Sequence, residues 1–266
     1  DENVKKPEGS VEFKNVSYSI DGEQILKNIN FKVKPGQKVG IIGATGAGKT
    51  SLINLMCRFY DVDSGEVLVG GRNVKDMDLR VLRQSIGMAM QDVFLFSDTI
   101  EGNIAYAKPD CPFERVEWAA KIADAHDFIM QLTDGYETKL GDRGVNLSGG
   151  QRQALTLLMA TLVTPKLLLL DEHTAALDPA TAEKVLALTK SIVAEKKITC
   201  LMVTHNMHQA LELGNRTLMM DAGRIVFDVK GAARSKMTVD DLLEKFRENA
   251  GKTLDNDRIL LSKVEK

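Results

Sequence analysis

A glycine-rich segment from Gly43 to Thr50 constrains this chain more than any other feature. It reads Gly-Ala-Thr-Gly-Ala-Gly-Lys-Thr, follows the apolar segment Lys38–Ile42, and precedes a helical pattern from about Lys49 to Phe59. The spacing G-x-x-x-x-G-K-[ST] between a strand and a helix predicts a phosphate-binding loop. Glycines let backbone N–H groups curl around phosphate oxygens, and the N-terminus of the helix adds a partial positive charge.

The residue types of this loop predict how a nucleoside triphosphate would be held. The Lys49 ammonium would reach the β- and γ-phosphates, and the Thr50 hydroxyl would bind Mg²⁺. A glycine-rich turn that matches the motif by chance is the alternative, which the strand–loop–helix context disfavours. We expect the nucleotide-binding residues of the loop to be Gly43, Ala44, Thr45, Gly46, Ala47, Gly48, Lys49, Thr50 and Ser51.

A second candidate element is the apolar run Leu167–Leu170, which Asp171 and Glu172 follow directly. The run predicts a buried central strand, and open α/β sheets bind ligands at the carboxyl ends of their strands. Asp171 would hold Mg²⁺ through water, and Glu172 would polarise the attacking water. Taken alone, the pair is also compatible with an ordinary acidic strand end, but the upstream phosphate-binding loop favours the catalytic interpretation.

The rest of the chain predicts an α/β fold with an inserted helical part. Val11–Ile20 and Ile25–Val33 flank the turn Asp21-Gly22, which predicts a hairpin of two half-buried strands. Later strands alternate with helices, as in a largely parallel sheet, whereas residues 99–163 have a helical pattern. We expect a linker (1–10), an antiparallel β part with the first part of the core (11–91), a helical subdomain (92–163), the second part of the core (164–230) and a C-terminal helical tail (231–266).

Composition excludes several other classes. Hydrophobic residues make up 44% of the chain and charged residues 27%, which is ordinary for a globular protein. A net charge of −2 gives no reason to expect a nucleic-acid partner. The three cysteines are widely spaced, which indicates free thiols in a reducing compartment. No apolar run approaches the roughly 18–20 residues that span a bilayer, so any membrane part is expected to lie outside this chain.

One further motif narrows the class. The segment Leu147–Gln153 reads Leu-Ser-Gly-Gly-Gln-Arg-Gln and resembles the signature motif of ABC (ATP-binding cassette) ATPases. Ser148, Gly149, Gly150 and Gln151 would open a helix and form a second anion site. In the family this site meets the γ-phosphate bound by a partner subunit, so the resemblance implies a head-to-tail homodimer around two ATP molecules. The resemblance covers about residues 10–230 and implies a P-loop NTPase (RecA-like) core, with an antiparallel β subdomain and an inserted α-helical subdomain.

Other family elements match in order along the chain. Gln91 resembles the glutamine that contacts Mg²⁺ and water, Asp178 the aspartate of the loop that crosses the dimer interface, and His205 the histidine that contacts the γ-phosphate. By this resemblance the catalytic residues are Lys49, Gln91, Glu172 and His205, and the metal ligands are Thr50, Gln91 and Asp171. The other histidines have simpler interpretations: His126 and His208 as helix-surface residues, and His173 as a loop variant that follows Glu172.

The sequence departs from the family pattern at the adenine position. The family stacks adenine on an aromatic residue of the first hairpin, where this chain has Ile20. Tyr18 lies two residues earlier on the same strand face and is a candidate to stack in its place. A core role for Tyr18 is an equally good interpretation, with adenine packing on aliphatic surface alone. Lost stacking would weaken ATP binding by about 0.5–1.5 kcal/mol.

The two halves resemble different branches of the family. Residues 90–106 and 135–150 resemble exporter-type domains, whereas the part from about Ala154 onward resembles the stand-alone ATPase subunits of import-like systems. One hypothesis is a recombined or engineered chain joined near Gln151–Gln153, and the alternative is a natural divergent member. An ill-fitted junction in a packed core would cost several kcal/mol, of the order seen for overpacked cores, and would lower turnover.

The resemblance implies the ATPase motor of a transporter, which requires ATP and Mg²⁺. Its partners would be a second copy and a transmembrane domain absent from this chain, and it would lie in the cytoplasm against the inner face of a membrane. The alternative function is a folded ATP-binding domain with little or no coupled activity. Soluble ABC ATPases of translation or DNA repair are disfavoured, because neither a second cassette nor a long coiled-coil insertion is evident.

Overall fold

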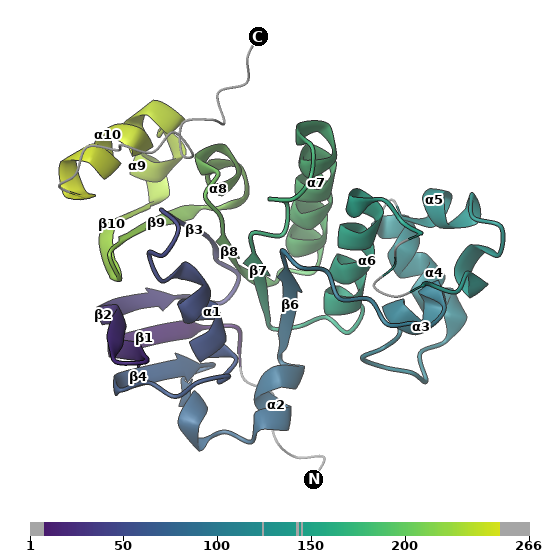
Figure 1. The fold of residues 1–266 in the computed structure, drawn as a ribbon, viewed down its shortest axis with the longest axis horizontal. Helices are drawn as coiled ribbons and strands as arrows, with labels where there is room; N and C mark the ends of the chain where they lie inside the picture. The colour runs from purple at the N-terminus through teal and green to yellow at the C-terminus, as the bar shows by residue number, and fades with distance from the viewer. Residues whose placement is uncertain (1–7, 124, 142–143, 145, 251–266) are drawn as a thin grey trace. The chain divides into compact units, whose positions relative to one another are not determined.

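The computed structural model describes residues 8–123, 125–141, 144 and 146–250. These residues form two compact units, the first containing the chain up to Ile86 and again from Thr199, and the second containing Gly87–Ile198. The boundaries of these units differ from those of the expected parts. Residues 164–198, which were expected in the second part of the core, belong to the same unit as the helical segment 92–163. Figure 1 shows the chain coloured from the N-terminus to the C-terminus.

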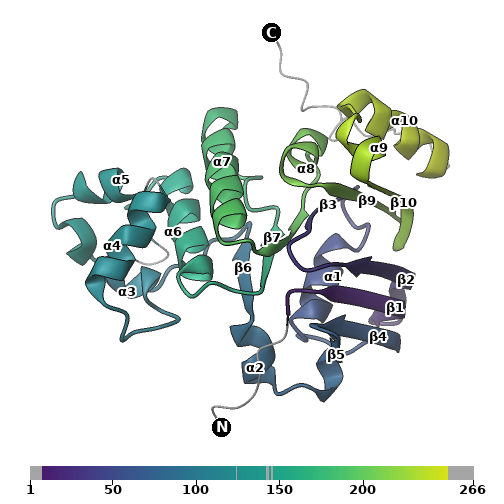
Figure 2. The ribbon, with the colours of Figure 1, turned by 180° about the vertical axis from the view of Figure 1, so that it is seen from behind.

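The first unit contains an antiparallel sheet that begins with the predicted hairpin (Figure 2). Its strands lie in the order β2-β1-β4-β5 and comprise β1 (Val11–Ile20), β2 (Glu23–Val33), β4 (Ser64–Val69) and β5 (Arg72–Asn73). Asp21 and Gly22 both have positive φ, 50° and 82°, as two-residue hairpin turns require. Phe13 and Phe31 stack on the buried face with ring centroids 4.7 Å apart.

The first unit also contains the strands that carry the phosphate-binding loop. They lie in the order β10-β9-β3-β8, and β3 is parallel to both of its neighbours, whereas β9 and β10 are antiparallel. The predicted mixed α/β fold is therefore confirmed. The bounds are β3 (Lys38–Gly43), β8 (Thr199–Val203), β9 (Arg216–Asp221) and β10 (Arg224–Lys230).

Helices complete the first unit. The helix α1 (Lys49–Met56) follows the glycine-rich loop, and η1 (Val74–Asp76) and α2 (Leu79–Gln84) follow the antiparallel strands. At the other end of the chain, α8 (Met207–Leu213), α9 (Gly231–Ser235) and the amphipathic helix α10 (Val239–Ala250) lie together beside β9 and β10 (Figure 1). Leu242, Leu243 and Phe246 of α10 share a buried cluster with Ile42 and Met207, so this helix packs behind the strand that leads into the loop.

The second unit is mainly helical. Its two strands, β6 (Ile86–Met90) and β7 (Leu167–Asp171), are neighbours, and α6 packs along α7. None of the helices in the described ranges is both long and apolar enough to cross a bilayer. The other elements of this unit are α3 (Ile100–Ile104), α4 (Phe113–Ile122), α5 (His126–Met130), η2 (Gly135–Glu137), α6 (Gly149–Thr161) and α7 (Pro179–Glu195).

Candidate functional site

The glycine-rich loop connects β3 to α1 and depends on its glycines. Gly46 and Gly48 have φ of 80° and 93°, a region that residues with a Cβ rarely adopt. A Cβ on Gly43 would lie 2.3 Å from the carbonyl oxygen of Met220, and one on Gly48 would lie 2.6 Å from Leu26. Larger residues are therefore excluded by both backbone conformation and close packing, and the loop backbone is fixed in its curled form.

Lys49 lies inside this loop. Its side chain is 5% exposed, and its ammonium donates to the carbonyl oxygens of Gly43, at 2.9 Å, and Ala44, at 3.0 Å. The first turn of α1 has glycine as its N-cap residue, whereas α6 and α7 are capped by the side chains of Ser148 and Asp178. A phosphate would supply at α1 what a capping oxygen supplies at those helices. The donor set thus fits a nucleotide phosphate.

His205 leaves the same sheet edge as the loop. Ile41 of β3 is paired with Val203 of the neighbouring parallel strand β8, and the Thr204 amide donates to the Ile41 carbonyl at 3.0 Å. Gly43 lies two residues after Ile41, and His205 lies two residues after Val203, so both residues lie at the same end of these two strands. His205 is exposed, and Asn206 next to it caps α8 through the Gln209 amide. The structure therefore brings His205 and the phosphate-binding loop to one edge.

The adenine side of this unit favours the core interpretation of Tyr18. Its side chain is only 5% exposed, and its ring centroid lies 5.8 Å from that of Tyr60. Burial, followed by the nearby Tyr60, raises the pKa of Tyr18. Ile20, in contrast, is 44% exposed on the same strand. Stacking of adenine on Tyr18 thus stays an untested prediction that the burial of the ring disfavours.

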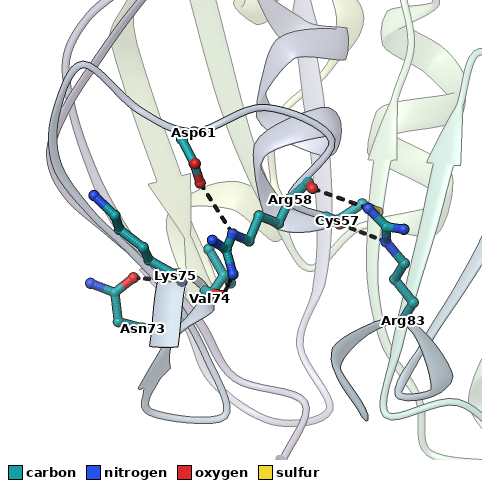
Figure 3. Close-up of polar contacts among 7 residues, drawn as sticks. All are labelled: Cys57, Arg58, Asp61, Asn73, Val74, Lys75 and Arg83. Carbon is teal, nitrogen blue, oxygen red and sulfur yellow. Dashed lines mark hydrogen bonds and ion pairs between the residues drawn. The ribbon is translucent and has the colours of Figure 1, made fainter. Parts of the chain in front are cut away.

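A network that sequence reasoning missed fixes the far end of α1 (Figure 3). The Arg83 guanidinium of α2 donates to the carbonyl oxygens of Cys57, at 3.2 Å, and Arg58, at 3.1 Å. These carbonyls follow the last turn of α1, where a cation is favourable. Arg58 in turn donates to Asp61 at 3.1 Å and to the Val74 carbonyl at 3.4 Å. No local pattern marks Arg83, because its partners lie 25 and 26 residues away.

In the second unit, the candidate carboxylates stand at the end of a fully buried strand. All residues of β7 are buried, and Asp171 is 7% exposed. Glu172 follows with a φ of 48°, and its carbonyl oxygen accepts from the Ala175 amide at 2.9 Å. The strand therefore delivers Asp171 and Glu172 to the same end, as predicted, with a tight turn directly behind them.

The signature segment begins α6 as predicted. The Ser148 hydroxyl accepts from the Gln151 amide at 3.3 Å, and the Gln151 side chain accepts from the Ser148 amide at 2.9 Å, which is a capping box. Asp178 caps α7 by accepting from the Thr181 amide at 3.1 Å, and hydrogen bonds with Thr181 lower the pKa of Asp178. A Cβ on Gly150 would lie 2.3 Å from the Thr181 methyl, so the signature helix and α7 meet closely.

Gln91 follows β6 and is exposed. Its carbonyl oxygen, like that of Met90, accepts a hydrogen bond from the Gln153 side chain, at 3.3 and 3.2 Å. The signature helix thus holds the backbone on which the Gln91 side chain is mounted. The first unit therefore contains the phosphate-binding loop, Tyr18 and His205. The second contains the other predicted site residues, which are Gln91, Ser148, Gly149, Gly150, Gln151, Asp171, Glu172 and Asp178.

The remaining histidines differ in their surroundings. His208 is exposed on α8, as expected. His126 is half-buried, with Nδ1 3.0 Å from the Tyr136 hydroxyl, so it is not a simple surface residue. His173 is only 2% exposed, and burial lowers its pKa to about 4. Its ring faces the interior, where Nε2 lies 3.2 Å from the hydroxyl oxygen of Thr189. The position of His173 in a loop does not reveal this burial.

Comparison with known proteins agrees with this arrangement. The profile of the ABC transporter family matches residues 26–175, which is more than half of the chain. The chain therefore belongs to the ABC transporter family. It spans about two fifths of the length of the bacterial relatives described next.

Two relatives and one solved structure illustrate the similarity. A putative multidrug export ATP-binding/permease protein from Bacillus subtilis is 42% identical over 82% of this chain and 37% of its own length. An ATP-dependent lipid A-core flippase from Methylobacillus flagellatus is 42% identical over 85% of this chain and 39% of its own length. The structure of a bacterial Atm1-family ABC exporter with ATP bound matches with a TM-score of 0.81 and 32% identity, covering 94% of this chain and 43% of the exporter chain.

Proposed function

We propose that this chain binds and hydrolyses Mg-ATP as the motor of a membrane transporter, in a head-to-tail dimer of two copies. The observation that carries the proposal is that the phosphate-binding loop and His205 leave neighbouring parallel strands at one edge. Phosphate donors and a histidine gathered in this way suit the binding of a terminal phosphate. The relatives named as export proteins and flippase support the transport role.

Different residues would bind the phosphates, activate the attacking water and hold Mg²⁺. The loop amides and Lys49 would hold the β- and γ-phosphates, and His205 would contact the γ-phosphate. Glu172 would orient and polarise the attacking water. Thr50, Gln91 and Asp171 offer the hydroxyl, amide and carboxylate oxygens that suit Mg²⁺, which would neutralise charge that develops on the phosphates.

The proposed dimer is supported by the second candidate anion site. The capped N-terminus of α6, with Ser148, Gly149 and Gly150, offers amides and a positive helix end to a phosphate. A second copy, placed head to tail, would bring its signature helix to the ATP held by the first, with Asp178 at the interface. The transmembrane partner would be provided by sequence outside this chain, and the domain would lie in the cytoplasm against the inner face of the membrane.

The test is the ATPase rate as a function of protein concentration, for the chain and for its Glu172→Gln variant. The proposal predicts a rate that rises faster than linearly, because two copies build each site, and a loss of roughly 10²–10⁴-fold in the variant. Size-exclusion chromatography of Glu172→Gln should show a dimer with Mg-ATP and a monomer without nucleotide.

Two results would contradict the proposal in different ways. If the folded wild-type chain does not bind Mg-ATP, the loop is not a nucleotide site. Measurable binding with a flat and negligible rate would leave the alternative, an ATP-binding domain without turnover.

A further inference from the structure

Glu172 has a backbone conformation that its surroundings must maintain. Its φ of 48° lies in the left-handed region, which residues other than glycine seldom adopt without support. The bond from the Ala175 amide to the Glu172 carbonyl, at 2.9 Å, closes a turn with His173 and Thr174 at its centre. The direction of the Glu172 carboxylate therefore depends on what holds this turn.

The His173 side chain ties the turn to the middle of α7. Its ring is 2% exposed, and Nε2 lies 3.2 Å from the hydroxyl oxygen of Thr189, which is fully buried. The Thr189 hydroxyl donates to the Val185 carbonyl at 2.8 Å. A hydroxyl has one proton to donate, so Thr189 accepts from His173, and Nε2 carries the hydrogen. The chain of donation runs from His173 through Thr189 to the backbone of α7.

The helix at the other end of this chain is itself fixed. The helix α7 has 17 residues, and its first turn is capped by Asp178 and packs against the signature helix where Thr181 approaches Gly150. Thr189 therefore belongs to a helix, α7, that is held in place by other contacts. A hydrogen bond from His173 to this element limits both rotation and shift of the turn.

We propose that His173 is a positioning residue, which orients the Glu172 carboxylate toward its water by bonding the turn to Thr189. This inference rests on the proposed function, because it assigns His173 an effect through Glu172. His173 touches no nucleotide in this scheme. Its loss should therefore slow the hydrolytic step and leave nucleotide binding unchanged.

The variants separate the hydrogen bond from packing. His173→Leu keeps an apolar volume but removes the N–H donor, and His173→Gln places an N–H donor near the position of Nε2. Thr189→Val removes the hydroxyl at the other end. Thr161→Val is the matched control, because Thr161 is 1% exposed and its hydroxyl donates to the Leu157 carbonyl at 2.7 Å, in a helix of the same unit with no histidine partner.

Steady-state and single-turnover hydrolysis by the full 266-residue chain provide the measurement. We expect kcat to fall roughly 10- to 100-fold in His173→Leu and Thr189→Val, as for a misplaced catalytic group. KM and the Kd of Mg-ATP should stay within about twofold of wild type, and His173→Gln should recover much of the rate. Thr161→Val should keep a wild-type kcat. A loss of kcat in this control as large as in Thr189→Val would overturn the proposal, as would a wild-type kcat in His173→Leu.

The Glu172→Gln background tests whether His173 acts through Glu172. There, His173→Leu should cause no further loss of residual hydrolysis, because the carboxylate that it orients is absent. A further loss equal to that in the wild-type background would refute the assignment. If His173→Leu does not fold, Thr189→Val takes its place in both backgrounds, because it removes the same hydrogen bond from the other end. Failure of the proposed function itself is recognised separately, since the wild-type chain would then be inactive or Glu172→Gln would be as active as wild type.

Discussion

The close approach of Gly150 to Thr181 leads to a quantitative prediction for Gly150→Ala. The added Cβ would lie 2.3 Å from the Thr181 methyl carbon, whereas carbon atoms pack at about 3.5–4.0 Å. Thr181 cannot turn away freely, because a β-branched side chain in a helix has a restricted χ1 and because its amide is held by Asp178 at 3.1 Å. The start of α6 must therefore move away from α7.

The expected cost follows from two opposing effects. Overpacking of this kind costs about 1–3 kcal/mol, and alanine regains at most about 1 kcal/mol over glycine in a helix. The free energy of unfolding should thus fall by up to about 2 kcal/mol, and Tm should fall by up to roughly 8 °C for a domain of this size. Thr181→Ser removes the methyl and keeps the hydroxyl. In that background Gly150→Ala should be neutral, or should stabilise by up to about 1 kcal/mol.

Urea unfolding of wild type, both single variants and the double variant provides the assay. Gly149→Ala serves as the control, because its Cβ would lie 3.0 Å from the end of the flexible Leu177 side chain and should cost little. The reasoning is refuted if Gly150→Ala costs the same with serine as with threonine at position 181.

Three other predictions concern the first unit. Ile20→Tyr should tighten Mg-ATP binding by about 0.5–1.5 kcal/mol, or roughly 2- to 12-fold, in titration calorimetry; unchanged affinity would show that the base does not lie at Ile20. Arg216 is 4% exposed and its partner Asp228 is 38% exposed. Asp228→Asn should lower the free energy of unfolding by about 3 kcal/mol, because it leaves the buried Arg216 cation without its counterion. Arg216→Met should cost less, and the reverse order in urea unfolding would contradict this. Arg83→Met should cost about 1–2 kcal/mol through its two carbonyl bonds, with Arg80→Met, at an exposed position of the same helix, nearly neutral and with Mg-ATP affinity unchanged in both variants.

Local patterns predicted the elements of the fold closely. The segment predicted as a strand at Val11–Ile20 has those bounds in the structure, and the strand predicted at Leu167–Leu170 is one residue longer. Alternation, or an apolar run with clear flanking signals, is local information. The helix after the loop was expected to reach Phe59, but it ends at Met56. Beyond that end, Arg58 has a φ of 49°, and Arg83 donates to the carbonyl oxygens of Cys57 and Arg58. Periodicity does not encode this contact from a distant segment.

The candidate site residues were predicted from motif spacing, which does not predict what surrounds each side chain. Spacing placed Lys49 at the start of the helix after β3, and Glu172 and His205 directly after the strands that precede them, because each motif is defined by its position next to an apolar run. The burial of Tyr18 and His173 depends on Tyr60 and Thr189, which lie 42 and 16 residues away along the chain. Exposure of a single aromatic ring or imidazole is therefore a tertiary property that the sequence pattern left open.

The contacts around the proposed junction at Gln151–Gln153 bear on the recombination hypothesis. Gly150, before the junction, packs against Thr181 after it, and Gln153 is 3% exposed and donates to the carbonyls of Met90 and Gln91. Of the two side-chain polar atoms of Gln153, the oxygen is buried without a hydrogen-bond partner among the described residues. A recombined chain would need two parents that shared these close contacts. The similarity to the flippase also extends over 228 residues, which is too long to lie on one side of the junction. Both observations favour the natural alternative, in which the two halves were selected together.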